Sequence, residues 1–238
     1  MYHFYPMEER NEHSGIIRPA LEAAAPIMLG YVAIGIPCGL LGIKSGLELW
    51  MVFLMSCTFY SGAGQFMIPN LLMAGTPLAS IILSVAFVNT RQMLYSASFA
   101  PYMSKVSKSL SFLFAATVTD ESFGVNLDRY NSGEPWDARK ATLVNIFSMS
   151  SWTISNVVGA LIGEAITMPI AIASFAMTSI FICLFMGQPK NRTNLVVAAF
   201  TVIGVVVFKS IGLSGPAILF GALTGIAAGV VSDAVMGS

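Results

Sequence analysis

Three ionisable residues interrupt apolar stretches near the middle of this 238-residue chain. Arg91 lies in "AFVNTRQMLY", and Asp120 and Glu121 are adjacent in "TVTDESFG". A lone arginine at the centre of a membrane helix costs roughly 2.5 to 3.5 kcal/mol on insertion scales, so such charges are usually paired and functional. We expect Arg91 to pair with one of the two carboxylates. The pair either belongs to a substrate or proton pathway or is a structural ion pair between two helices.

The residues around Arg91 have the composition of a cavity lining. Serine and aromatic side chains recur at intervals of three and four along one helical stripe with Arg91: Ser80, Ser84, Phe87, Tyr95, Ser98 and Tyr102. Adjacent residues of a helix point about 100° apart, so one of Asp120 and Glu121 can meet Arg91 while the other faces a different neighbour.

The stretch "CTFYSGAGQFMIPN", residues 57–70, predicts a broken helix, because Gly62, Gly64 and Pro69 all weaken a continuous one. Helix ends at mid-membrane depth expose backbone groups that suit the carboxylate and ammonium of a small zwitterion. Gln65 and Asn70 would add hydrogen bonds. The alternative is a helix that is kinked but closed. An apolar pocket would be formed by Phe59, Phe66, Met67 and Phe87.

The elements that must position these residues are membrane helices. The chain is 55% hydrophobic and only 10% charged, against roughly 25% charged residues in soluble domains, and its mean hydropathy is +0.75. Apolar runs of about 20 residues predict an all-α integral membrane protein, residues 1–238 forming one transmembrane domain after a short cytosolic tail, 1–16. We expect seven to eight transmembrane helices, at least one of them broken. The candidate spans are 19–43, 49–73, 77–103, 109–127, 141–163, 168–187, 194–210 and 214–235.

Basic residues predict the orientation of the bundle. If all eight segments cross, the N-terminus and the 128–140 loop are cytosolic, with Lys44, Lys105 and Lys108 outside. The cytosolic side then holds most of the basic residues, as the positive-inside rule requires: Arg10, Arg18, Arg129, Arg139, Lys140, Lys190 and Arg192. No two segments are similar enough in sequence to establish an internal repeat, which leaves an inverted repeat open.

Several kinds of chemistry are disfavoured by composition. The chain has no net charge and no basic face, so nucleic acid is not an expected partner. His3 and His13 precede the first span, which leaves no histidine for a haem, a zinc site or a Ser-His protease in the bundle. There is no phosphate-binding GxxxxGK[ST] loop, so the chain itself should not hydrolyse ATP. We expect no cofactor and no metal.

Four motifs together resemble the AzlC family, the large subunits of bacterial branched-chain amino acid exporters: "FYSGAGQF", "VNTRQMLY", "TDESFG" and "SSW". The resemblance covers roughly residues 16–210. It implies export of leucine, isoleucine, valine or related amino acids across the bacterial inner membrane, together with a small AzlD-like membrane subunit. One departure is Gln92, at a position where the family commonly has histidine, so a proton relay through that residue is not expected here.

The resemblance also implies which residues act. The substrate-binding candidates are Phe59, Ser61, Gly62, Gly64, Gln65, Phe66, Asn89, Arg91 and Tyr95, and the candidates for coupling to protons or another ion are Asp120 and Glu121. Small-residue faces would pack helices closely, and one of them, at Gly221, Gly225 and Gly229, could accept a helix of the small subunit.

The function we expect is secondary transport. The broken segment and Arg91 would hold the substrate carboxylate, and Asp120 or Glu121 would meet the ammonium or a coupled proton. Two alternatives are a passive channel with the same polar stripes and an intramembrane enzyme that uses Asp120 and Glu121. The enzyme is disfavoured because adjacent carboxylates on one helix diverge instead of flanking a substrate.

Overall fold

The computed structural model describes residues 12–104, 106–133, 135–165, 191–213 and 217–236, and Phe175, Thr178, Ser179, Ile182 and Met186. The described residues form helices and no strands, as expected. By length and composition, four of these helices can cross a membrane: Gly15–Lys44, Leu78–Ser98, Ala138–Gly163 and Arg192–Ser210. Most of the span expected at 168–187 and most of the tail lie outside the described residues. The crossing expected at 168–187 therefore stays a prediction.

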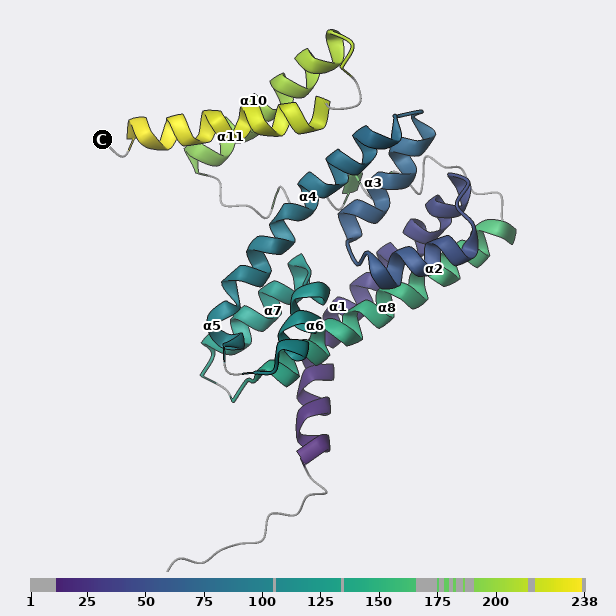
Figure 1. The fold of residues 1–238 in the computed structure, drawn as a ribbon, viewed down its shortest axis with the longest axis vertical. Helices are drawn as coiled ribbons and strands as arrows, with labels where there is room; N and C mark the ends of the chain where they lie inside the picture. Colours follow the sequence, from purple (N-terminus) through teal and green to yellow (C-terminus); the bar gives the residue numbers. More distant parts are fainter. Residues whose placement is uncertain are drawn as a thin grey trace, which may run out of the picture.

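Two long helices, α1 (Glu12–Lys44) and α8 (Ala138–Ala165), form the scaffold and lie side by side (Figure 1). They run parallel, because Met28 of α1 accepts a hydrogen bond from Ser151 of α8, while further along both helices Leu40 lies against Gly163. Glycine permits this approach. A Cβ atom at Gly39 would lie 2.9 Å from the backbone nitrogen of Ala160.

The segment 49–73 forms a helical hairpin, which we call the outer hairpin. Helix α2 (Leu49–Thr58) ends at mid-bundle, and α3 (Gly62–Met73) leaves in nearly the opposite direction (Figure 1). The Gln65 amide on α3 reaches back to the carbonyl of Met55 on α2, at 3.1 Å, so the two helices lie together at the break. Helix α3 then packs antiparallel to α4 (Leu78–Ser98), with Met67 near Ile81 and Val85.

The segment 108–131 forms a second hairpin, the inner hairpin, from α6 (Lys108–Thr117) and α7 (Asp120–Asn131). Helix α4 continues into the short α5 (Ala100–Met103). The directions of α6 and α7 can therefore both be compared with that of α4–α5. On α6, Ala115 contacts Ser96 whereas Ser111 contacts Met103. On α7, Phe123 stacks on Tyr95 whereas Tyr130 stacks on Tyr102. Helix α6 is therefore antiparallel to α4–α5 and α7 is parallel, so the chain reverses at Val118 and Thr119.

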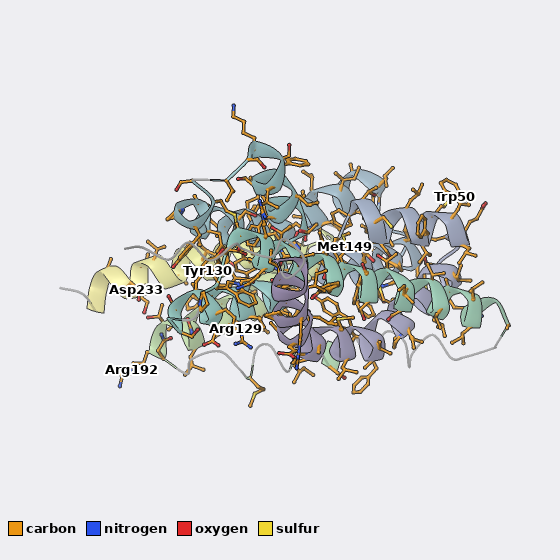
Figure 2. All side chains as sticks on the ribbon, turned by 90° about the horizontal axis from the view of Figure 1, so that it is seen from below. Trp50, Arg129, Tyr130, Met149, Arg192 and Asp233 are labelled. Carbon is orange, nitrogen blue, oxygen red and sulfur yellow. The ribbon has the colours of Figure 1, made fainter. Side chains whose placement is uncertain are left out.

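These reversals correct the predicted topology. The segments 49–73 and 109–127 are not continuous crossings, because each returns toward the end from which it entered. Trp50, near the start of α2, lies at the opposite end of the bundle from Arg129 and Tyr130 at the end of α7 (Figure 2). Each hairpin precedes a long helix, α4 or α8, and these two run in opposite directions. Residues 49–98 and 108–165 are thus two hairpin–helix units in inverted orientation, which sequence similarity left open.

The corrected topology changes the predicted side of Lys108. If α1 starts on the cytosolic side, as predicted, α4 returns to that side and α8 leaves it again, while each hairpin stays on its own side. The start of α1 accordingly meets the 129–140 region, since Pro19 and Glu22 share a surface pocket with Arg129 and Lys140. Lys108, expected outside, then lies on this same side, which strengthens the positive-inside bias.

Helices α10 (Arg192–Ser210) and α11 (Ala217–Met236) form an antiparallel pair that also touches α4 (Figure 1). Gly221 packs on Val205, and Gly225 packs on Thr201 and Val197. The glycine face expected to receive a partner helix is therefore already occupied by α10 of the same chain.

The α1–α8 contact should be sensitive to one methyl group. We expect Gly39→Ala and Gly159→Ala each to destabilise the protein by about 1 to 3 kcal/mol, the usual cost of overpacking, because the added Cβ meets backbone of the opposite helix. Gly30→Ala is the matched control on α1, since nothing lies within 4 Å of its Cβ position. Unfolding of the purified protein in detergent measures the difference, and equal stability of all three variants would contradict the contact.

Cysteine labelling distinguishes hairpins from kinked crossings. In a background without native cysteines, we expect Ala74→Cys to react with an impermeant maleimide applied outside the cell. Ser107→Cys and Ser132→Cys should react only after permeabilisation. Two kinked crossings give the reverse result for the first two positions, with Ser107→Cys labelled from outside and Ala74→Cys protected, whereas position 132 is the internal control for both topologies.

Candidate functional site

The two hairpin tips meet at Tyr31 on α1, near the middle of the bundle. Tyr60 belongs to the outer tip, and its ring lies edge-on to that of Tyr31 with centroids 6.2 Å apart. Thr119 belongs to the inner tip, and its Oγ1 lies 2.9 Å from the Tyr31 hydroxyl. A second aromatic contact, 5.2 Å between centroids, joins Tyr31 to Trp152 on α8. The scaffold helices thus fix the place where the tips approach each other.

The outer tip is held by Gln65, which is fully buried. Its amide nitrogen donates to the carbonyls of Met55 and Phe59, and its oxygen accepts from Ser56 and from the indole of Trp152, the latter at 3.0 Å. These bonds add a side-chain donor to two carbonyls at the end of α2, each of which also accepts a backbone N–H. In this structure Gln65 therefore joins the tip to α8 and has no hydrogen-bonding capacity left over.

Other proposed binding residues of the outer tip also pack internally. Phe66 is buried against Trp152, with ring centroids 6.4 Å apart. Gly64 lies so close to the ring of Phe59 that an added Cβ atom would be 2.7 Å from it. Gly62 faces the Trp152 ring at ordinary contact distance. These three residues therefore pack inside the tip, and Gly64 leaves room for the ring of Phe59.

The inner tip is held in a similar way by side chains of other helices. Asn145 on α8 donates to the carbonyl of Phe114, and Ser96 on α4 donates to that of Ala115, at 3.3 and 3.1 Å. At the start of α7, Thr119 and Ser122 exchange hydrogen bonds as a capping box. Capping of this kind satisfies backbone N–H groups of the first helical turn.

Residues 89–92 of α4 contact both tips. The Ser61 hydroxyl donates to Asn89 Oδ1 at 2.6 Å, and Gln92 donates to the Tyr60 carbonyl at 3.2 Å. Between them, Arg91 Nη1 lies 2.7 Å from Asp120 Oδ2 on the inner tip. Asp120 is thus the carboxylate that pairs with Arg91. Gln92 supports the outer tip.

The Arg91–Asp120 pair is mostly buried, but one donor and one acceptor of the pair lack a hydrogen-bond partner in the described part of the chain. The two side chains are 31% and 20% exposed, and Arg91 Nε and Asp120 Oδ1 are buried without a hydrogen-bond partner among the described residues. Tyr95, one helical turn from Arg91, stacks on Phe123 of α7 with centroids 4.5 Å apart. A buried donor and acceptor left unpaired next to each other are unfavourable unless water or a ligand meets them.

Glu121 points to a different neighbour, as the helical geometry predicted. Its Oε2 accepts a hydrogen bond from the Tyr31 hydroxyl at 2.7 Å. The two adjacent carboxylates therefore bind separate elements, Asp120 to α4 and Glu121 to α1. This divergence does not favour the enzyme alternative, which needs both groups on one substrate.

A small, open surface groove lies beside the outer tip, with a volume of about 300 Å³. It has polar and apolar walls from the tip, from α4 and from the end of α6: Phe59, Ala86, Asn89, Gln92, Met93, Ser96, Ala115 and Ala116. This volume is at the lower end of the range for ligand pockets and suits a small molecule.

The two tips differ in charge. Helix α7 carries Asp120 and Glu121 in its first turn, where anions are favoured by the helix dipole. Helix α3 has no acidic residue in its first turn, and only the Ser61 hydroxyl caps it. The start of α3 is therefore the helix end at this site that lacks an anion of its own.

Four of the residues proposed from the sequence lie at the tips: Asn89, Arg91, Asp120 and Glu121. Two tyrosines that contact them there, Tyr31 and Tyr60, were not proposed. Tyr60 had a signal, because it lies inside the helix-breaking motif, whereas no spacing rule connects Tyr31 to a carboxylate 90 residues away. Within the described ranges, no three His, Cys, Asp or Glu side chains are grouped so that they could hold a metal ion.

The ion pair makes a prediction about folding. Arg91→Gln and Asp120→Asn should each lower the thermal stability of the purified protein, by somewhat less than the roughly 3 to 5 kcal/mol of a fully buried pair, since one charge is left alone. The double variant should be more stable than either single one. Arg18→Gln, in an exposed pair with Glu22, is the control and should change stability by about 0.5 kcal/mol or less. Additive losses in the double variant would show that the two charges do not interact.

Comparisons with known proteins identify a family and several relatives. The family described as AzlC protein matches residues 26–166, which include both tips and Arg91. An uncharacterized membrane protein of Helicobacter pylori is 32% identical over 169 residues, 71% of this chain and 73% of its own length. No solved structure matches the chain.

Two further relatives carry informative names. The inner membrane protein YgaZ of Escherichia coli is 26% identical over 180 residues, 73% of this chain and 74% of its own length. The branched-chain amino acid transport protein AzlC of Bacillus subtilis is 25% identical over 222 residues, 90% of this chain and 85% of its own length. With more than half of its length matched by the family, this chain belongs to the AzlC family.

Proposed function

We propose that this protein is a secondary transporter that exports small apolar amino acids, including branched-chain ones, across the bacterial inner membrane. The observation that carries the proposal is the Arg91–Asp120 pair, which lies between two hairpin tips and retains an unpartnered donor and acceptor. The name of the Bacillus subtilis relative supports the substrate class, and that of the Escherichia coli relative supports the location.

An amino acid zwitterion complements this pair. An arginine guanidinium stays protonated at any physiological pH, so Arg91 offers a permanent cation with a free Nε for the substrate carboxylate. The free Oδ1 of Asp120 offers an acceptor for the ammonium group. Because the substrate is neutral overall, its binding leaves the charge of the site unchanged, which limits the desolvation cost inside the membrane.

The outer tip supplies the remaining contacts. The first turn of α3, with Ser61 and Gly62, attracts the substrate carboxylate because it has no acidic residue of its own. The groove beside it would take an apolar side chain against Phe59, with Asn89 at its polar edge. Tyr95 lines the approach to Arg91. Gln65, Gly64 and Phe66 act by holding the tip in shape.

The paired hairpins provide two gates for alternating access. The outer hairpin closes the site from one side of the membrane and the inner hairpin closes it from the other, around a fixed site at the interface of two inverted units. Asp120 and Glu121 on the inner tip are the candidates for coupling to a proton gradient. A small AzlD-like membrane subunit remains part of the proposal on the strength of the family resemblance, with its docking face elsewhere than Gly221, Gly225 and Gly229.

Transport by reconstituted protein tests this function. Liposomes with the chain, with and without its small subunit, are given radiolabelled leucine and an imposed pH gradient. We expect accumulation above equilibrium, reduced at least about tenfold by Arg91→Gln and unchanged by Arg18→Gln, because only the first removes the carboxylate site. Equilibration without accumulation would indicate a passive channel. Normal accumulation by Arg91→Gln would contradict the proposed site.

A further inference from the structure

Glu121 is electrostatically distinct from the neighbouring ion pair. Among the described residues it has no basic partner, whereas Asp120 is paired with Arg91. Its recorded hydrogen bond comes from the Tyr31 hydroxyl on α1. Glu121 is exposed, whereas Tyr31 and Thr119 beside it are 4% and 3% exposed. This carboxylate therefore joins an accessible surface to a buried group of hydroxyls.

This cluster of buried hydroxyls extends to Tyr60 on the outer tip. Tyr60 is only 6% exposed, and its hydroxyl has no hydrogen-bond partner among the described residues. It lies near enough to Tyr31, Thr119 and Glu121 to interact with them electrostatically. An unpartnered buried hydroxyl beside a carboxylate is unfavourable unless another arrangement of the same hydrogen bonds, or a bound molecule, satisfies it.

We propose that Glu121, and not Asp120, carries the proton that is coupled to substrate movement, and that Tyr31 is its positioning residue. This proposal rests on the proposed transport function and assigns separate tasks to the two carboxylates. Asp120 remains ionised as the partner of Arg91 and of the substrate ammonium. Glu121 touches no substrate and exchanges its proton with water at its exposed side.

The proton transfer has a direct structural consequence. A hydronium ion gives its proton to a Glu121 oxygen, which forms one O–H bond, leaves a water molecule and neutralises the carboxylate. The bond from Tyr31 then loses its charge assistance, and charge-assisted hydrogen bonds are roughly twice as strong as neutral ones. The tie between α1 and the first turn of α7 is weakened, which favours opening of the inner tip. The Tyr31 proton becomes free to turn toward Tyr60.

The other charged and titratable groups around Glu121 allow this assignment. On its own helix the neighbour is Asp120, whose charge is balanced by Arg91 on α4. Helix α1 presents Tyr31, the outer tip presents Tyr60, and α8 presents the uncharged Trp152 to the same cluster, while Tyr95 of α4 lies close enough to interact with both carboxylates. Glu121 is thus the acid in this cluster whose charge is not already compensated.

The test compares transport by variants of the two adjacent carboxylates, Glu121 and Asp120. The proteins are reconstituted in liposomes as the full chain, together with the small subunit where transport needs it. Leucine exchange at equal pH on both sides reports substrate movement, and accumulation driven by a pH gradient reports coupling. We expect Glu121→Gln to retain exchange within about twofold and to lose accumulation. Asp120→Asn, the matched control, should lose both by about tenfold or more. Tyr31→Phe should change the pH dependence of accumulation, because Glu121 loses its hydrogen-bond donor.

Three results would overturn the proposal: gradient-driven accumulation by Glu121→Gln, loss of exchange by this variant while it remains monodisperse, or loss of coupling alone in Asp120→Asn. Absence of leucine exchange by the unmodified protein would contradict the proposed function instead. In that case infrared difference spectra recorded during a pH titration still show which of the two carboxylates binds the proton. The carbonyl band of a protonated carboxyl group should be missing in Glu121→Gln and present in Asp120→Asn, and the opposite pattern would exclude Glu121.

Discussion

A helix that ends inside a membrane must have its free carbonyl and N–H groups hydrogen-bonded by protein, because lipid offers no partners. Both hairpins of this protein meet that requirement with amide and hydroxyl side chains from elsewhere in the chain. Gln65 and Gln92 bind the carbonyls of the outer tip, and Asn145 and Ser96 bind those of the inner tip. The polar residues of the motifs therefore stabilise the two chain reversals by hydrogen bonding. Without them the tips could not remain at mid-bundle, and there would be no site between them.

The scaffold explains why the tips meet in one place. Glycines bring α1 and α8 into backbone contact, and this contact places Tyr31 beside Trp152. Tyr31 touches the inner tip through its hydroxyl and the outer tip through the edge of its ring, whereas Trp152 holds Gln65. Small residues at positions distant from the chemistry thus determine the spacing of the groups that perform it.

The same arrangement makes movement possible. The contacts of the inner tip with α1 and α4 include two carboxylates, whose hydrogen bonds depend on charge, whereas the outer tip is joined to α4 through uncharged amides and hydroxyls. In the proposed mechanism the two tips are gates that respond to different events, the inner one to protonation and the outer one to substrate. Since each gate is a short hairpin attached to a long helix, it can move while the α1–α8 scaffold stays in place.

The sequence by itself determined the class of protein, the helical content and the charges that had to meet. These follow from local physics: hydropathy requires membrane helices, and an arginine within one requires a carboxylate such as Asp120. The glycines of the 57–70 motif predicted a broken or kinked helix there, without deciding between the two. Only the tertiary structure decided that the chain reverses at the tips instead of crossing, because an apolar run of about 20 residues has the same hydropathy in either case. It also decided that Asp120 pairs with Arg91 and that Glu121 accepts a hydrogen bond from Tyr31. Either of two adjacent carboxylates could have paired with the arginine, and the packing of α1, α4 and α7 selects between them.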